Sequence, residues 1–122
     1  NGASGSLLQM IKSNRISGLI SQLILDEVIR HADKINLDQN TARQKAENIF
    51  GSNISHAPLE RNVETYYSKV SDPGDAHVLA TYKEQNCDAL VTLDKKHLLI
   101  LQGKIKNINI FSPGEFLVSK FK

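Results

Sequence analysis

The sequence predicts a three-layer α/β/α domain with a mainly parallel central sheet, and two observations carry this prediction. Short segments rich in β-branched or aromatic residues alternate with segments of helical period, which is typical of a parallel sheet covered by helices. Residues 89–93 (ALVTL) form a continuous apolar run, as expected of a strand buried on both faces of such a sheet. The 122 residues suit one domain, so we expect residues 1–122 to fold as one.

The first half of the chain is predicted to be mainly helical. We expect a loop over residues 1–6, a short helix over 6–13, a strand over 15–20, and helices over 21–35 and 38–50. Ser21 is the predicted N-cap of the long helix, because its hydroxyl can accept from a free amide of the first turn. The apolar stripe predicted for this helix comprises Leu23, Ile24, Val28, Ala32 and Ile35.

The second half alternates more regularly. We expect a strand over residues 63–70, a helix over 73–86, strands over 89–93 and 107–111, a helical turn up to residue 101, and a last helix over 113–121. Pro73 suits the first helical position, where its missing N–H leaves no hydrogen bond unmade. Ser112 is the predicted cap of the last helix.

Composition and charge narrow the class of protein. With 40% hydrophobic and 23% charged residues, the chain reads as an ordinary soluble globule. A net charge of +2 is too small by itself to indicate nucleic-acid binding. The single cysteine, Cys87, excludes an internal disulfide and favours a reduced, cytoplasmic setting. No apolar run reaches the roughly 20 residues of a membrane span.

Three carboxylates stand out by position. Asp94 directly follows the apolar strand, and ligands of open α/β sheets gather at the carboxyl ends of strands; it could equally cap the next helical turn. Asp75 lies in a first helical turn on the face of Val78 and Leu79, where an unpaired buried acid is costly. Asp72 three residues earlier also makes a capping box possible.

Glu27 is the third acid and lies near the flank of the apolar stripe on the long helix. A boundary glutamate that pairs with Arg30 or His31 is the plainer interpretation. Together, however, the three acids could converge on one hard divalent cation, since Mg²⁺ and Mn²⁺ take carboxylate oxygens. Such a site suits phosphodiester hydrolysis.

The order of these segments resembles a PIN domain. Residues 72–80 (DPGDAHVLA) and 89–94 (ALVTLD) look like the family's acid before a V-L-A helix and its strand ending V-T-x-D. Residues 108–117 (INIFSPGEFL) look like its last strand and S-P-x-E-F helix start. Residues 19–28, with Ser21 and Glu27, are similar to its S-x-x-x-x-x-E element. The resemblance covers nearly the whole chain and is more specific in the carboxyl half.

This resemblance implies an Mg²⁺- or Mn²⁺-dependent ribonuclease that acts on single-stranded RNA. Glu27, Asp75 and Asp94 match the family's acidic positions and are expected to be catalytic and to hold the metal, with Asp72 and Thr92 supporting them. Many bacterial and archaeal members are toxins of toxin–antitoxin pairs. An antitoxin protein and a second copy of the chain are therefore expected partners beside RNA.

One departure from the family pattern concerns the start. PIN domains begin with a strand ending in an aspartate, whereas this chain starts in the loop NGASGS. We expect the parent protein to hold that strand, and this chain to be a truncation that lacks one metal ligand. The alternative function is then a PIN-like module that binds RNA or a protein without cleaving.

Basic residues follow the strand-end acid. Lys95 and Lys96, with His97 beside them, could meet RNA phosphates next to the metal. A solvated positive helix start is an equally good interpretation. No spacing of Cys and His residues supports a zinc site.

Overall fold

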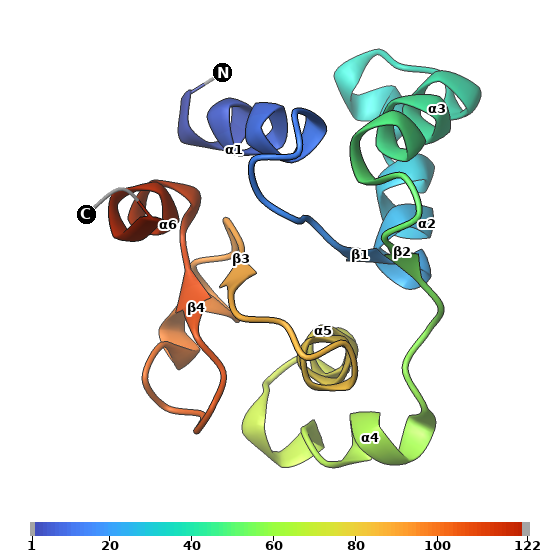
Figure 1. The fold of residues 1–122 in the computed structure, drawn as a ribbon. Helices are drawn as coiled ribbons and strands as arrows, with labels where there is room; N and C mark the ends of the chain where they lie inside the picture. The colour runs from blue at the N-terminus through green and yellow to red at the C-terminus, as the bar shows by residue number, and fades with distance from the viewer. Residues whose placement is uncertain (1, 121–122) are drawn as a thin grey trace. The chain divides into compact units, whose positions relative to one another are not determined.

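The computed structural model describes residues 2–120, and the chain divides into two compact units. The N-terminal unit comprises Gly5–Ala57, and the C-terminal unit comprises Asn1–Ser4 with Pro58–Lys122. Each contains one pair of parallel strands among its helices (Figure 1). This mixed α/β architecture with parallel strand pairs confirms the predicted fold class, while a single domain over the whole chain stays a prediction.

In the N-terminal unit, helices surround a short parallel pair. Its elements are α1 (Gly2–Lys12, which contains residues of both units), β1 (Ile20–Ser21), α2 (Gln22–Arg30), the 3₁₀ helix η1 (Ala32–Ile35), α3 (Gln39–Phe50) and β2 (Ile54–Ser55). Ile20 pairs with Ile54 and Ser21 with Ser55. The helix predicted over residues 6–13 thus starts earlier, inside the segment 1–6 that was predicted to be a loop. Asn1, the first residue of that segment, lies outside the described residues.

Side-chain caps fix two helix starts in this unit, and the cap at Ser21 was predicted from the sequence. Ser21 Oγ accepts the Ile24 amide hydrogen at 3.2 Å, which begins α2. Asp38 Oδ1 accepts the Thr41 amide hydrogen at 2.8 Å, and Thr41 Oγ1 donates to Asp38 Oδ2 at 2.9 Å. The bond from the Thr41 backbone is the main reason why the pKa of the Asp38 carboxyl is lowered. Gly51, at φ 57°, ends α3 where the sequence predicts a stop.

The buried face of α2 differs from the predicted stripe. Leu25, Ile29 and Ala32 are buried and pack with Ala42 of α3. Leu23, Val28 and Ile35 of the predicted stripe are exposed, Ile35 at 66%. Both sets have helical spacing, so only the position of α3 decides between them. The predicted long helix also breaks at His31, and Asn36 ends η1 in the left-handed conformation at φ 61°.

The C-terminal unit follows the predicted alternation more closely. Its elements are α4 (Glu60–Glu64), the 3₁₀ helix η2 (Tyr67–Lys69), α5 (Pro73–Glu84), β3 (Leu90–Val91), the 3₁₀ helix η3 (Leu99–Leu101), β4 (Ile110–Phe111) and α6 (Pro113–Lys120). In the parallel pair β3 and β4, Leu90 lies opposite Ile110 and Val91 opposite Phe111. The strands are shorter than predicted, and Phe121, the last residue of the predicted final helix, lies outside the described residues.

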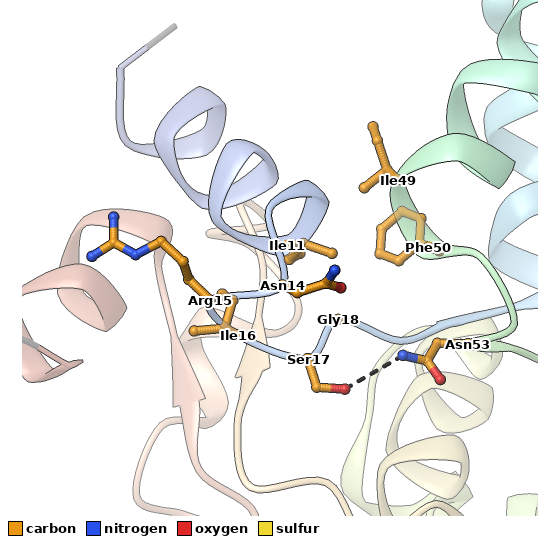
Figure 2. Close-up of a pocket in the computed structure, with 9 residues that line it drawn as sticks. All are labelled: Ile11, Asn14, Arg15, Ile16, Ser17, Gly18, Ile49, Phe50 and Asn53. Atoms are coloured by element: carbon orange, nitrogen blue, oxygen red, sulfur yellow. Dashed lines mark hydrogen bonds between the residues drawn. The ribbon is translucent and has the colours of Figure 1, made fainter.

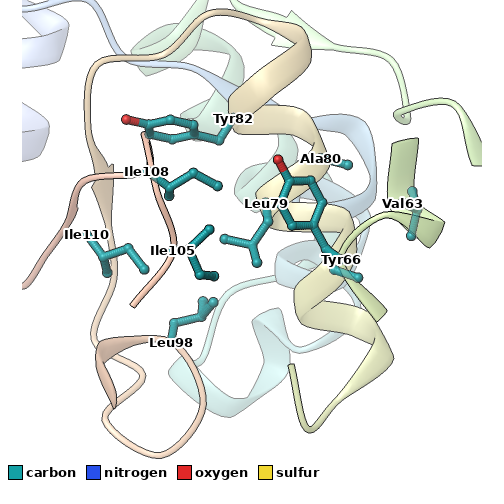
Figure 3. Close-up of a cluster of buried hydrophobic side chains, with 10 residues drawn as sticks. Val63, Tyr66, Leu79, Ala80, Tyr82, Leu98, Ile105, Ile108 and Ile110 are labelled. Atoms are coloured by element: carbon teal, nitrogen blue, oxygen red, sulfur yellow. The ribbon is translucent and has the colours of Figure 1, made fainter. Parts of the chain in front are cut away.

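The core of this unit forms around α5. Leu79 and Ala80 are fully buried on different sides of α5: Leu79 points toward Ile105, and Ala80 points toward Val63 of α4 (Figure 3). The other buried members of the cluster are Val63, Tyr66, Ala76, Tyr82, Leu98, Ile105, Ile108 and Ile110. Because α5 packs on several sides, its first turn, which carries Asp75, is held firmly in place.

The strand predicted over residues 63–70 is wrong. This segment forms the end of α4 and then η2, in which Val63 and Tyr66 are buried at helical spacing while Tyr67 stays exposed. The carboxylate of Glu84 on α5 accepts hydrogen bonds from the Leu59 backbone amide at 2.8 Å and from Asn62 at 2.6 Å. Leu59 and Glu84 are 25 residues apart in the sequence, and their hydrogen bond anchors the start of α4. The β propensity of residues 63–70 depends on neighbouring residues alone and therefore does not reveal this contact.

A capping box begins the last helix. The Ser112 amide donates to Glu115 Oε1 at 2.8 Å, and the Glu115 amide donates to Ser112 Oγ at 3.2 Å. Gln102 adds a hydrogen bond to the same Glu115 oxygen. The predicted cap at Ser112 is thus confirmed. Among residues 2–120, no helix is both long and apolar enough to cross a membrane.

Candidate metal centre

Asp75 is positioned by the first turn of α5. Asp72 caps this helix, its Oδ1 accepting the Gly74 amide hydrogen at 2.9 Å, and Pro73 occupies the first turn. The Asp75 side chain is partly buried, and its neighbour Ala76 is completely buried. An acid in the first turn is stabilised by the helix dipole, which offsets part of the cost of removing it from water. Asp72 itself is exposed and has a structural role as a cap.

Asp94 lies three residues after β3 ends, in a tight turn. Its amide donates to Thr92 Oγ1 at 3.1 Å, so the threonine fixes the backbone that carries the acid. Its Oδ1 accepts the amide hydrogens of Lys96 at 3.1 Å and His97 at 3.0 Å. Asp94 therefore caps the following turn, which is the alternative that the sequence leaves open for this residue. Its other oxygen, Oδ2, lies near a different partner.

That partner is His97, which the sequence did not single out as a ligand. Its Nδ1 lies 3.4 Å from Asp94 Oδ2, and the two side chains are 40% and 33% exposed. One ligand atom from each of Asp75, Asp94 and His97 lies within 4.8 Å of the other two. The turn after Asp94 brings the imidazole back beside the acid, so the spacing D-x-x-H was the available signal in the sequence.

The structure thus brings together two of the three predicted acids. Asp75 and Asp94 are 19 positions apart in the sequence, and a helix start and a strand end place their carboxylates in one cluster. Glu27 is an exposed residue of α2 in the N-terminal unit. Its membership of the site stays a prediction.

Two lysines border this cluster in the sequence. Lys95 and Lys96 are exposed, on the turn that Asp94 caps. Exposed ammonium groups are available to phosphate oxygens, but they are equally typical of a solvated surface. Their predicted role in RNA binding therefore stays a prediction.

A separate hollow of about 210 Å³ lies within the N-terminal unit (Figure 2). Asn53 donates to Ser17 Oγ at 3.4 Å along its wall. None of the predicted site residues is among those that line it, which are Ile11, Asn14, Arg15, Ile16, Ser17, Gly18, Ile49, Phe50 and Asn53. Gly18 is needed here for steric reasons, since a Cβ at this position would lie 2.5 Å from Ile11 Cδ1.

Comparison with known proteins gives one match. The family model described as "PIN domain" matches residues 1–96, a range that contains Glu27, Asp75 and Asp94. The match ends before β4 and α6, so the resemblance predicted for residues 108–117 is not covered by it. No curated protein matches the chain, and no solved structure does.

Proposed function

The chain belongs to the PIN domain family, whose members are typically nucleases, and we propose that it is a metal-dependent ribonuclease that cuts single-stranded RNA. One observation carries this proposal: carboxylates from α5 and from the end of β3 lie in one partly buried cluster. Such a pair at the carboxyl edge of a strand is where open α/β folds place their chemistry.

The donor atoms fit a small divalent cation. Neighbouring ligands of an octahedral ion at about 2.1 Å lie roughly 3.0 Å apart, and opposite ligands roughly 4.2 Å apart. The separation of 3.4 Å between His97 Nδ1 and Asp94 Oδ2 falls in this range. The ligand atoms of all three residues lie within 4.8 Å of one another, an upper limit that slightly exceeds the range. A side-chain adjustment of about half an ångström closes that difference. We propose Asp75 and Asp94 as ligands of Mg²⁺ or Mn²⁺.

The bound ion would lower the pKa of a coordinated water and neutralise charge on the scissile phosphate. The protein's own residues hold the ligands in place. Thr92 and the amides of Lys96 and His97 fix Asp94, whose Oδ2 lies 3.4 Å from His97 Nδ1. Asp72 fixes the helix start that carries Asp75. Ligands that are already ordered lose little entropy when the cation binds.

Three further assignments belong to this proposal and rest on the sequence. Glu27 is a third carboxylate of the site, and Lys95 and Lys96 bind the phosphates of RNA. The chain acts as the toxin of a toxin–antitoxin pair, with an antitoxin protein and a second copy of itself as partners. Each exposed residue named here can be replaced without disturbing a core.

The test is cleavage of a fluorescent single-stranded RNA with Mn²⁺ or Mg²⁺. Asp94→Asn keeps the size of the side chain and an oxygen for the cap, but removes the charge that holds a cation. We expect it to lower kcat/KM at least a hundredfold, while Asp88→Asn, an exposed control, leaves it unchanged.

Metal-dependent cleavage that Asp94→Asn leaves intact would contradict the proposal. RNA that the chain binds but does not cleave would instead support a PIN-like binding module. A duplex RNA of the same sequence serves as the control for strand preference.

A further inference from the structure

The cluster contains a nitrogen donor beside its two carboxylates. We infer that His97 is itself a metal ligand and that it makes the site selective for Mn²⁺ over Mg²⁺. This inference rests on the proposed function, because it concerns the same cation site. It goes beyond that function by assigning a nitrogen ligand and the class of metal that this ligand prefers.

The position of the imidazole is set by the backbone. The His97 amide donates to Asp94 Oδ1 at 3.0 Å, and the Leu99 amide donates to the Asp94 carbonyl at 2.8 Å. This turn brings the His97 side chain back beside Asp94, and His97 Nδ1 lies 3.4 Å from Asp94 Oδ2. Two ligands three residues apart on one capped turn can hold an ion without any rearrangement of the chain.

The surroundings of His97 leave the site open on one side. With 40% of the His97 side chain and 33% of the Asp94 side chain exposed, water or a phosphate oxygen can complete the coordination shell. A structural zinc site would instead be closed by four protein ligands. Asp75, Asp94 and His97 provide three ligands, and with Glu27 as a fourth an octahedral ion would still keep two positions for water or substrate.

The mixed donor set decides the metal class. Carboxylates alone suit Mg²⁺, which is strongly hydrated and prefers oxygen. Imidazole nitrogen suits first-row transition metals, while Mn²⁺ also accepts carboxylates and octahedral geometry. One nitrogen and two carboxylate ligands therefore favour Mn²⁺ over Mg²⁺, whereas a site of oxygen ligands alone would discriminate less.

A purely structural role for His97 is the competing explanation. In that case the imidazole only forms an ion pair or hydrogen bond with Asp94, and a side chain that donates the same hydrogen bond would replace it. His97→Gln separates the two roles. Glutamine keeps a donor and similar reach, but it offers a cation an amide oxygen in place of the nitrogen.

The experiment measures Mn²⁺ and Mg²⁺ affinities of the chain by titration calorimetry, together with pulsed electron paramagnetic resonance of bound Mn²⁺. His97→Gln is compared with His56→Gln, a matched control at an exposed histidine whose Nδ1 lies 2.8 Å from the neighbouring Ala57 carbonyl oxygen. Circular dichroism confirms that each variant is folded.

We expect His97→Gln to weaken Mn²⁺ binding by about tenfold or more. Replacing a residue that only hydrogen-bonds to a metal ligand already costs about that much affinity, and loss of a ligand itself should cost at least as much. Mg²⁺ affinity should change far less, so the ratio of the two affinities falls. Coupling of bound Mn²⁺ to a histidine nitrogen should be present in the chain and in His56→Gln, and absent in His97→Gln.

An unchanged affinity ratio in His97→Gln, with no nitrogen coupling in the chain, would overturn the inference. Asp94→Asn distinguishes this failure from failure of the proposed function. If Asp94→Asn abolishes Mn²⁺ binding while His97→Gln leaves the affinity ratio unchanged, only the role of His97 is refuted. If Asp94→Asn still binds Mn²⁺ as the chain does, or if the chain binds no Mn²⁺, both are refuted.

Discussion

Leu79→Ala is expected to destabilise the C-terminal unit strongly. Leu79 is fully buried on α5, among the side chains that cover this helix (Figure 3). The substitution removes three carbon groups, each worth about 0.8 kcal/mol of transfer free energy. The cavity left behind adds to this loss, which gives a total of about 3 to 4 kcal/mol. That is a large share of the roughly 5–15 kcal/mol by which domains are stable.

Urea unfolding, followed by circular dichroism, measures this loss as a fall in the free energy of unfolding. Leu93→Ala is the matched control, because Leu93 is 71% exposed and its truncation should change the free energy by less than about 0.5 kcal/mol. A loss below about 1 kcal/mol for Leu79→Ala, or equal losses for the two variants, would refute the packing around α5. It would also remove the support for the position of Asp75.

The other predictions concern the N-terminal unit. Gly18→Ala should lower the free energy of unfolding by about 1–3 kcal/mol, because its Cβ would meet Ile11 at 2.5 Å. Gly5→Ala, in α1 with open space around it, should be neutral or stabilising by up to about 1 kcal/mol in the same urea experiment. The pKa of Asp38 is lowered in the folded protein, so its ionised cap stabilises the fold at pH values above the ordinary aspartate pKa. This stabilisation is lost as the pH falls through the pKa that Asp38 has in the folded protein. Asp38→Asn keeps the cap but does not titrate, so its Tm should fall less on acidification, and an identical pH profile would contradict the role of that carboxylate.

Local signals in the sequence predicted helix starts well. Ser21 and Ser112 cap helices as the sequence predicts, and Asp38 caps the helix predicted to start at residue 38. Each of these caps is a hydrogen bond from a backbone amide three residues on. Such bonds need only residues that are neighbours along the chain. The same reason explains why α3 and α5 begin where the sequence predicts.

Elements that depend on distant partners were predicted less well. The segment over residues 63–70 has β-branched and aromatic residues, yet Glu84 anchors it as a helix start and Val63 buries its side chain in the core. On α2, two apolar stripes compete, and contact with Ala42 selects the one that contains Leu25. Neither outcome can be read from local propensity, because the deciding contacts join residues far apart in the sequence.

The candidate site was predicted in part. Asp75 and Asp94 were selected from a helix start and a strand end, and these positions do bring them together. His97 was instead grouped with the basic residues Lys95 and Lys96. Its proximity to Asp94 depends on a turn that Asp94 itself caps, and no pattern of residue types along the chain reveals that contact.

The most direct test of the proposed metal site is an anomalous difference map from crystals of the chain soaked in Mn²⁺. The proposed site predicts one strong peak within about 2.5 Å of a carboxylate oxygen of Asp75 and one of Asp94. Crystals of Asp94→Asn, soaked in the same way, should lack that peak. A peak elsewhere, or none between these two carboxylates at saturating Mn²⁺, would contradict the proposal that they hold the cation.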